Sequence, residues 1–184
     1  MKTAKLLEDN AGERAFTLIE LMTVMVIMLI LATVSLSSFA YLRERSERAS
    51  CVSNLQNLFT AGTAYLVDHD NVWPQIPVSS IGTPPYAQAW ISVFTPYQLG
   101  PVNWICPTTQ RAMGNPNFLN AQAARVDYIG MPFGSQPYTA FRWPTQPWFE
   151  ENGPGHGDGP MFILTNGQVL SLNQSTQITA QPMP

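Results

Sequence analysis

The sequence predicts an α+β fold in which a long N-terminal helix packs on a small antiparallel β-sheet. Two observations support this prediction. No proline occurs before Pro74, and Gly62 is the only glycine in residues 16–68, so nothing breaks a helix over that stretch. Late in the chain, two apolar runs flank Asn166-Gly167, a pair that favours tight hairpin turns because both residues tolerate positive φ.

The expected helix has two halves of different character. Residues 21–42 contain no charged side chain, and about 22 apolar residues suffice to cross a bilayer. Beyond this run, apolar residues recur at spacings of three and four, which is typical of one buried helix face: Val52, Leu55, Phe59, Gly62 and Leu66. We therefore expect a transmembrane half at residues 16–42, an amphipathic half at 43–70, and a globular body at 71–184.

The two ends of the chain differ in composition. Residues 1–15 are polar and mixed in charge, which is typical of a processed leader. From Ala49 onward the chain has three arginines, no lysine and six acidic residues. A nucleic-acid surface needs a basic patch, so this composition excludes nucleic acid as a partner.

Motifs for catalysis are missing from the sequence. It has two histidines and lacks a G-x-S-x-G elbow, a C-x-x-C pair, an H-E-x-x-H helix and a glycine-rich phosphate loop. The stretch "EENGPGHGDG" gathers Glu150, Glu151, His156 and Asp158, which could offer oxygen ligands to a hard cation. Its spacing does not match the EF-hand pattern of calcium-binding loops, so we expect a solvated loop there, with no metal, cofactor or catalytic residue.

Two cysteines, Cys51 and Cys106, lie beyond the apolar run. If that run anchors the chain in an envelope, both cysteines face an oxidising compartment, which favours a disulfide between them. The alternative is a pair of buried free thiols.

The N-terminal stretch "AFTLIELM" resembles the class III signal of the type IV prepilin superfamily, in which an aromatic residue precedes a glutamate and an apolar helix. The resemblance implies that a prepilin peptidase cuts between Ala15 and Phe16 and methylates the new amine. Ala15 stands where the family usually has glycine. It also implies that Glu20 pairs with the Phe16 amine of a neighbouring subunit, a buried ion pair that would set the register of a filament.

The body resembles a prepilin-type, processing-associated group with an H-x9-D-G pattern. The resemblance rests on "RASCVSNLQNLFTAGTAYLVDHDNVWP", on "WICP", and on nine residues between His156 and Asn166-Gly167, with asparagine in place of aspartate. We expect His156, Asn166 and Gly167 to serve a structural turn. Strands would cover residues 161–165 and 168–172, joined by a type I′ turn. The His156 ring would bond a backbone carbonyl, or else lie in an exposed loop.

The resemblance implies a structural subunit, not an enzyme, in a type IV pilus or a type II secretion filament. Its partners would be prepilin peptidase, copies of itself or other pilin-like subunits, and the inner membrane. It would cross the inner membrane once before assembly, with its body in the periplasm or cell envelope, and then lie in a filament or at the cell surface. One rival is an exported protein cut after "SFA", residues 38–40. Another is a signal-anchored envelope enzyme or ligand- or metal-binding module.

Overall fold

The computed structural model describes residues 16–114, 124–153 and 156–179, without the side chains of residues 34–38 and 176–179. The chain divides into two compact units, Met1–Leu42 and Arg43–Pro184. The expected leader, residues 1–15 with Ala15, lies outside the described residues. Helix α1 (Leu18–Asp68) begins in the first unit and ends in the second.

Helix α1 has the length that the sequence predicts. It begins two residues after Phe16 and ends at Asp68, where Asp70 and Asn71 adopt positive φ and turn the chain. Within the described residues, no helix combines the length and the hydropathy that a membrane crossing requires. The membrane crossing expected for residues 16–42 stays a prediction.

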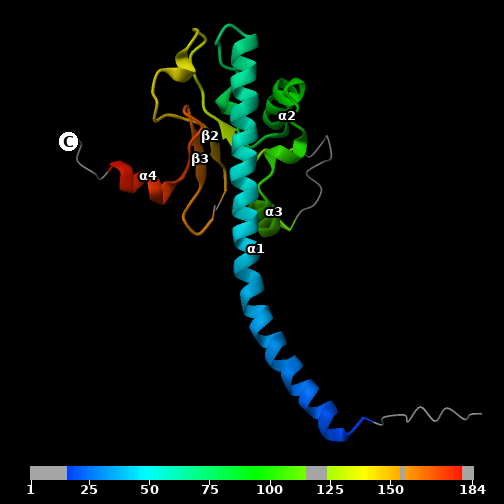
Figure 1. Cartoon of the computed structure of the whole chain (residues 1–184). Helices are drawn as coiled ribbons and strands as arrows, with labels where there is room; N and C mark the ends of the chain where they lie inside the picture. Colours follow the sequence, from blue (N-terminus) through cyan, green and yellow to red (C-terminus); the bar gives the residue numbers. More distant parts are fainter. Residues whose placement is uncertain (1–15, 115–123, 154–155, 180–184) are drawn as a thin grey trace, which may run out of the picture. The chain divides into compact units, whose positions relative to one another are not determined.

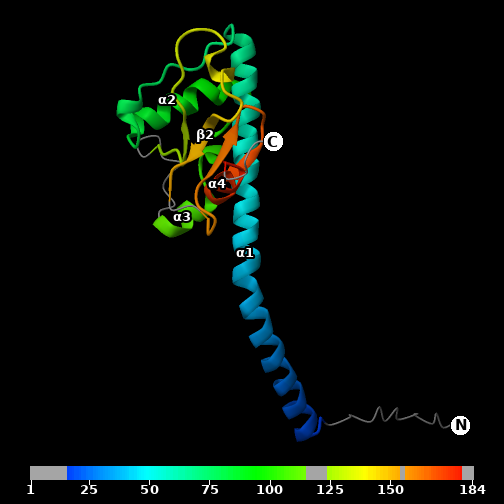
Figure 2. The same cartoon turned by 90° about the vertical axis from the view of Figure 1, so that its left-hand side faces the viewer.

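In the described residues of the second unit, four strands form one antiparallel sheet in the order β1-β2-β3-β4. The strands are β1 (Tyr128–Gly130), β2 (Pro147–Glu151), β3 (Met161–Leu164) and β4 (Val169–Ser171). Figures 1 and 2 show this sheet beside the second half of α1, together with α2 (Pro84–Phe94), α3 (Pro107–Met113) and α4 (Leu172–Thr179). The α+β prediction is confirmed.

Large aromatic side chains fill the core between α1 and the sheet. Trp73, Trp90, Trp104 and Trp148 are all fully buried, and so are Phe94 and Phe149. Many ring pairs are tilted or edge-on, an arrangement that aromatic quadrupoles favour. A small unit can thus bury a large apolar area with few residues.

The second half of α1 presents one apolar face to this core, as predicted. Of the expected stripe, Leu55, Gly62 and Leu66 are buried, whereas Val52 and Phe59 are half-buried. Cys51, Leu58 and Ala61 belong to the same face. At Gly62 the Trp148 ring, and not another backbone, lies 3.5 Å from where a Cβ would stand.

The hairpin between β3 and β4 forms where predicted, but its turn differs. Only Gly167 has positive φ, at 80°, so the expected type I′ turn is wrong. The Gly167 N–H donates to the Leu164 carbonyl (3.0 Å) and the Leu164 N–H to the Gln168 carbonyl (3.0 Å). These bonds define a three-residue loop ending in a left-handed glycine, which needs positive φ at one residue only. The second strand is also shorter, since Leu172 begins α4.

We expect Gly167→Val to destabilise the full chain by at least about 1 kcal/mol, the scale of a side chain forced into strained backbone space. A Cβ at Gly167 would also lie 3.1 Å from the Phe59 ring on α1. Urea unfolding of the detergent-solubilised chain, followed by tryptophan fluorescence, measures the change.

Gly82 provides the matched control for this prediction. It has φ of 81° but nothing within 4 Å of a Cβ, so Gly82→Val isolates the backbone strain from the contact with Phe59. If Gly167→Val and Gly82→Val lower the free energy of unfolding by the same amount, the contact with Phe59 has no role in holding the turn.

Candidate functional site

The first described residues form a capping box at the start of α1. The Thr17 backbone N–H and hydroxyl both donate to Oε2 of Glu20, at 2.9 and 2.7 Å. The Glu20 N–H in turn donates to the Thr17 hydroxyl oxygen at 3.4 Å. Threonine before a helix, with glutamate three residues later, satisfies N–H groups that have no partner within the helix. The sequence "TLIE", residues 17–20, contains this capping pattern. The helix cap is thus a structural role of Glu20 that the sequence analysis, which expects an assembly role, did not identify.

The first half of α1 exposes an apolar surface. From Phe16 to Leu31, the large apolar side chains are between 47% (Val24) and 80% (Phe16) exposed in the single chain. A continuous apolar surface of this kind marks contact with a partner or a lipid phase. Glu20 is the only charged residue in residues 16–42.

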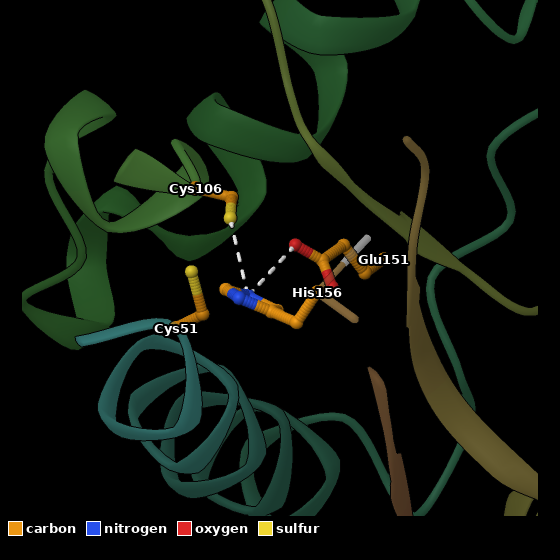
Figure 3. A group of neighbouring side chains, drawn as sticks. All are labelled: Cys51, Cys106, Glu151 and His156. Carbon is orange, nitrogen blue, oxygen red and sulfur yellow. Dashed lines mark hydrogen bonds and ion pairs between the residues drawn. The ribbon is translucent and has the colours of Figure 1, made fainter. Parts of the chain in front are cut away.

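A second feature lies inside the globular unit, where four side chains with metal-ligating atoms meet (Figure 3). Cys51 comes from α1, Cys106 from the residue before α3, Glu151 from the end of β2, and His156 from the loop between β2 and β3. Their sulfur, oxygen and nitrogen ligand atoms lie within 4.8 Å of one another. All four residues are buried, with none more than 5% exposed.

Hydrogen bonds to the backbone hold Cys106 against α1. Its N–H donates to Oδ2 of Asp127 at 2.9 Å, and Asn54 on α1 donates to the Ile105 carbonyl at 2.9 Å. The two cysteines therefore lie close together, as the predicted disulfide requires. Both are free thiols in the structure, and the bridge stays a prediction.

The hydrogen bonds of Thr108 define the orientation of the His156 ring. The Thr108 hydroxyl donates to Oε2 of Glu47 at 3.3 Å, and a carboxylate can only accept. The Thr108 oxygen, 3.3 Å from His156 Nδ1, must therefore accept from Nδ1–H. His156 Nε2 faces the cluster, 3.8 Å from Sγ of Cys106 and 3.7 Å from Oε1 of Glu151.

Burial and mutual contact shift the acidities of the cluster. Burial, together with the neighbouring Cys106 thiol, raises the pKa of Glu151 to about 7, while the bond from the Met161 N–H to Oε2 acts to lower this pKa. Among the described residues, Oε1 of Glu151 has no hydrogen-bond partner. The two thiols titrate as a pair: their mutual hydrogen bond lowers the pKa of Cys106 to about 5 and raises that of Cys51.

These contacts correct the expected solvated loop at residues 150–158. Glu151 and His156 are buried, so an exposed loop is wrong for both of them. The His156 ring contacts a threonine hydroxyl, not the backbone carbonyl that we expected. Asp158 instead pairs with Arg48 on α1.

The structure does not bring Asn166 and Gly167 into the cluster. Gly167 lies against Phe59. The four residues of the cluster come from four separate elements, so no local spacing in the sequence could have identified them as a group.

Comparison with known proteins identifies the N-terminal segment. Residues 10–36 match the family described as "Prokaryotic N-terminal methylation motif". No curated protein and no solved structure gives a significant match to the chain. Residues 10–36 therefore carry the prepilin-type methylation motif, which is typical of the type IV pilin and type II secretion pseudopilin superfamily.

Proposed function

We propose that this chain is a structural subunit of a type IV pilus or a type II secretion filament. The observation that carries the proposal is the methylation motif at residues 10–36, which leads directly into the exposed apolar half of α1. In the precursor this half would lie in the inner membrane. In the filament it would pack against the same half of neighbouring subunits, and the globular unit would face outward from the envelope.

The proposed processing gives Glu20 its role. Cleavage between Ala15 and Phe16 creates an amine at the edge of an apolar environment, where an unpaired charge is costly. Both bonds from Thr17 end on Oε2 of Glu20. Among the described residues no hydrogen bond ends on Oε1 of Glu20, so this oxygen is available to accept a hydrogen bond from the amine of an adjacent subunit. The chain would act as a scaffold, with no catalytic step of its own.

Export by an ordinary signal peptide is the alternative, with a cut after Ala40. Helix α1 is continuous from Leu18 to Asp68, so that cut would divide a regular helix in two. The continuity of α1 supports processing at Phe16.

The mature chain is expected to begin with N-methylated Phe16. Mass spectrometry of the N-terminal peptide, on protein extracted from membranes of cells with an active prepilin peptidase, tests this. Cells without the peptidase are the control and should retain Met1. A mature chain beginning at Tyr41, or retention of Met1 in both strains, would reject the proposal.

A further inference from the structure

We propose that Cys51, Cys106, Glu151 and His156 bind one Zn²⁺ ion, which joins α1 to the sheet of the globular unit. Two thiolates, an imidazole and a carboxylate form a ligand set that suits Zn²⁺ better than Ca²⁺ or Mg²⁺, which prefer oxygen alone. All four positions of a tetrahedron would be taken by protein atoms that are buried. A closed site of this kind is structural, not catalytic.

The separations between the four side chains suit a tetrahedral ion. Bond lengths of about 2.3 Å to sulfur and about 2.0 Å to nitrogen or oxygen place ligand atoms about 3.3–3.8 Å apart. His156 Nε2 lies 3.8 Å from Cys106 Sγ and 3.7 Å from Glu151 Oε1. No ligand pair exceeds 4.8 Å, so small side-chain movements complete the site.

The arrangement of the acceptor atoms in the cluster favours a cation at its centre. Because Nδ1 of His156 donates to Thr108, Nε2 is the ring nitrogen that points toward the sulfur of Cys106 and Oε1 of Glu151, where it can act as a metal ligand. Oε1 itself is buried without a hydrogen bond of good geometry among the described residues, and its neighbours are the Cys106 thiol and the His156 ring. A closer partner for Oε1 would lower the free-energy cost of its burial. A disulfide would use the two sulfurs alone and leave the carboxylate and the imidazole facing each other. One divalent cation accounts for all four groups.

The surrounding residues already have the form of an outer coordination shell. Metal-binding histidines commonly donate their second N–H to a fixed acceptor, which sets the ring orientation. Here Thr108 is that acceptor, and Glu47 orients its hydroxyl while pairing with Arg43 and Arg111. Thr108 is thus a positioning residue, outside the ligand set. On binding, the ion would displace the thiol protons and any proton on Glu151.

The test uses the full chain, purified in detergent from the cell envelope without chelators. Elemental analysis is expected to find about one zinc per chain, and intact mass under denaturing conditions to show two reduced cysteines. Replacement by Co²⁺ should give the near-ultraviolet charge-transfer bands of cobalt–thiolate bonds and the visible bands of tetrahedral cobalt.

Matched variants separate this site from adventitious metal. We expect Glu151→Gln and His156→Gln to weaken zinc binding by more than about tenfold, because replacing even an outer-shell partner of a metal ligand typically costs about 10–100-fold in affinity. Glu150→Gln and His69→Gln should bind as the unmodified chain does, since these residues lie outside the cluster. Thr108→Val, which removes the hydroxyl, should weaken zinc binding. Thr108→Ser, which keeps the hydroxyl, should bind zinc as the unmodified chain does. Circular dichroism checks that each variant keeps its helices.

Three results would overturn the proposal. In one, the isolated chain is lighter by two hydrogen atoms and metal-free, which would support the Cys51–Cys106 disulfide instead. In the next, the reduced chain takes up no zinc. This result would favour a protonated His156 ring between the Cys106 thiolate and the Glu151 carboxylate, without a metal. In the last, zinc binds equally well to Glu151→Gln, His156→Gln and their controls, which would show an adventitious ion only.

Discussion

Gly130→Ala is expected to destabilise the globular unit by about 3 kcal/mol or more, the upper range for overpacking a close-packed core. A Cβ at Gly130 on β1 would lie 2.2 Å from two atoms of the Trp90 indole, a distance that real atoms do not tolerate. Gly130 does not have positive φ, so the effect comes from space alone.

Trp90 cannot move aside to relieve this contact. Its ring stacks on Phe94 at a centroid distance of 5.7 Å and lies about 6 Å from Trp104 and 5.7 Å from Phe149. All of these rings are fully buried. Interiors packed to this density transmit strain instead of absorbing it. The strain that a side chain at Gly130 creates on β1 should therefore extend to α2, which carries Trp90 and Phe94.

Urea unfolding of the full chain in detergent, followed by tryptophan fluorescence, measures this loss. Gly62→Ala is the control: its Cβ would meet Trp148 at an ordinary 3.5 Å, and alanine favours a helix over glycine by roughly 0.5–1 kcal/mol. We therefore expect Gly130→Ala to lower the free energy of unfolding and Gly62→Ala to raise it. A loss below about 1 kcal/mol for Gly130→Ala would contradict the packing argument.

The features that the sequence predicts are those that local patterns encode. The length of α1 follows from the absence of helix breakers over residues 16–68, and its buried face follows from the spacing of residues such as Leu55 and Leu66. The hairpin follows from Asn166-Gly167 between apolar runs. The type of turn did not follow, because Asn-Gly suits both a two-residue loop and a three-residue loop that ends in a left-handed glycine.

The buried cluster lies beyond such patterns. Glu151 and His156 stand in a stretch rich in glycine and acidic residues, which resembles a solvated loop when read locally. Their burial depends on contacts with Cys51, 100 residues earlier, and with Thr108. The sequence indicated two parts of the cluster separately: the two cysteines, which do lie side by side in Figure 3, and the stretch that contains Glu151 and His156.

If the chain is processed and assembled as proposed, Glu20→Ala is expected to abolish its entry into the filament while leaving cleavage at Phe16 intact. Removing one member of a buried ion pair leaves the other charge unpaired, at about 3–5 kcal/mol. That corresponds to a loss of more than about a hundredfold in the equilibrium for subunit entry. Shearing filaments from cells and quantifying this chain by immunoblot, against the membrane fraction, measures the effect.

The capping box offers a second explanation for the same loss, and two variants distinguish the explanations. Glu20→Gln keeps an acceptor for the bonds from Thr17 but removes the charge, since glutamine serves a capping box as glutamate does. Thr17→Ala removes the threonine side chain from the box, at roughly 0.5–2 kcal/mol of helix stability, and keeps the charge. If the amine of a neighbour needs the carboxylate, Glu20→Gln fails to assemble as Glu20→Ala does, and Thr17→Ala assembles. If the start of the helix is what matters, Thr17→Ala fails and Glu20→Gln assembles, and the ion-pair argument is wrong.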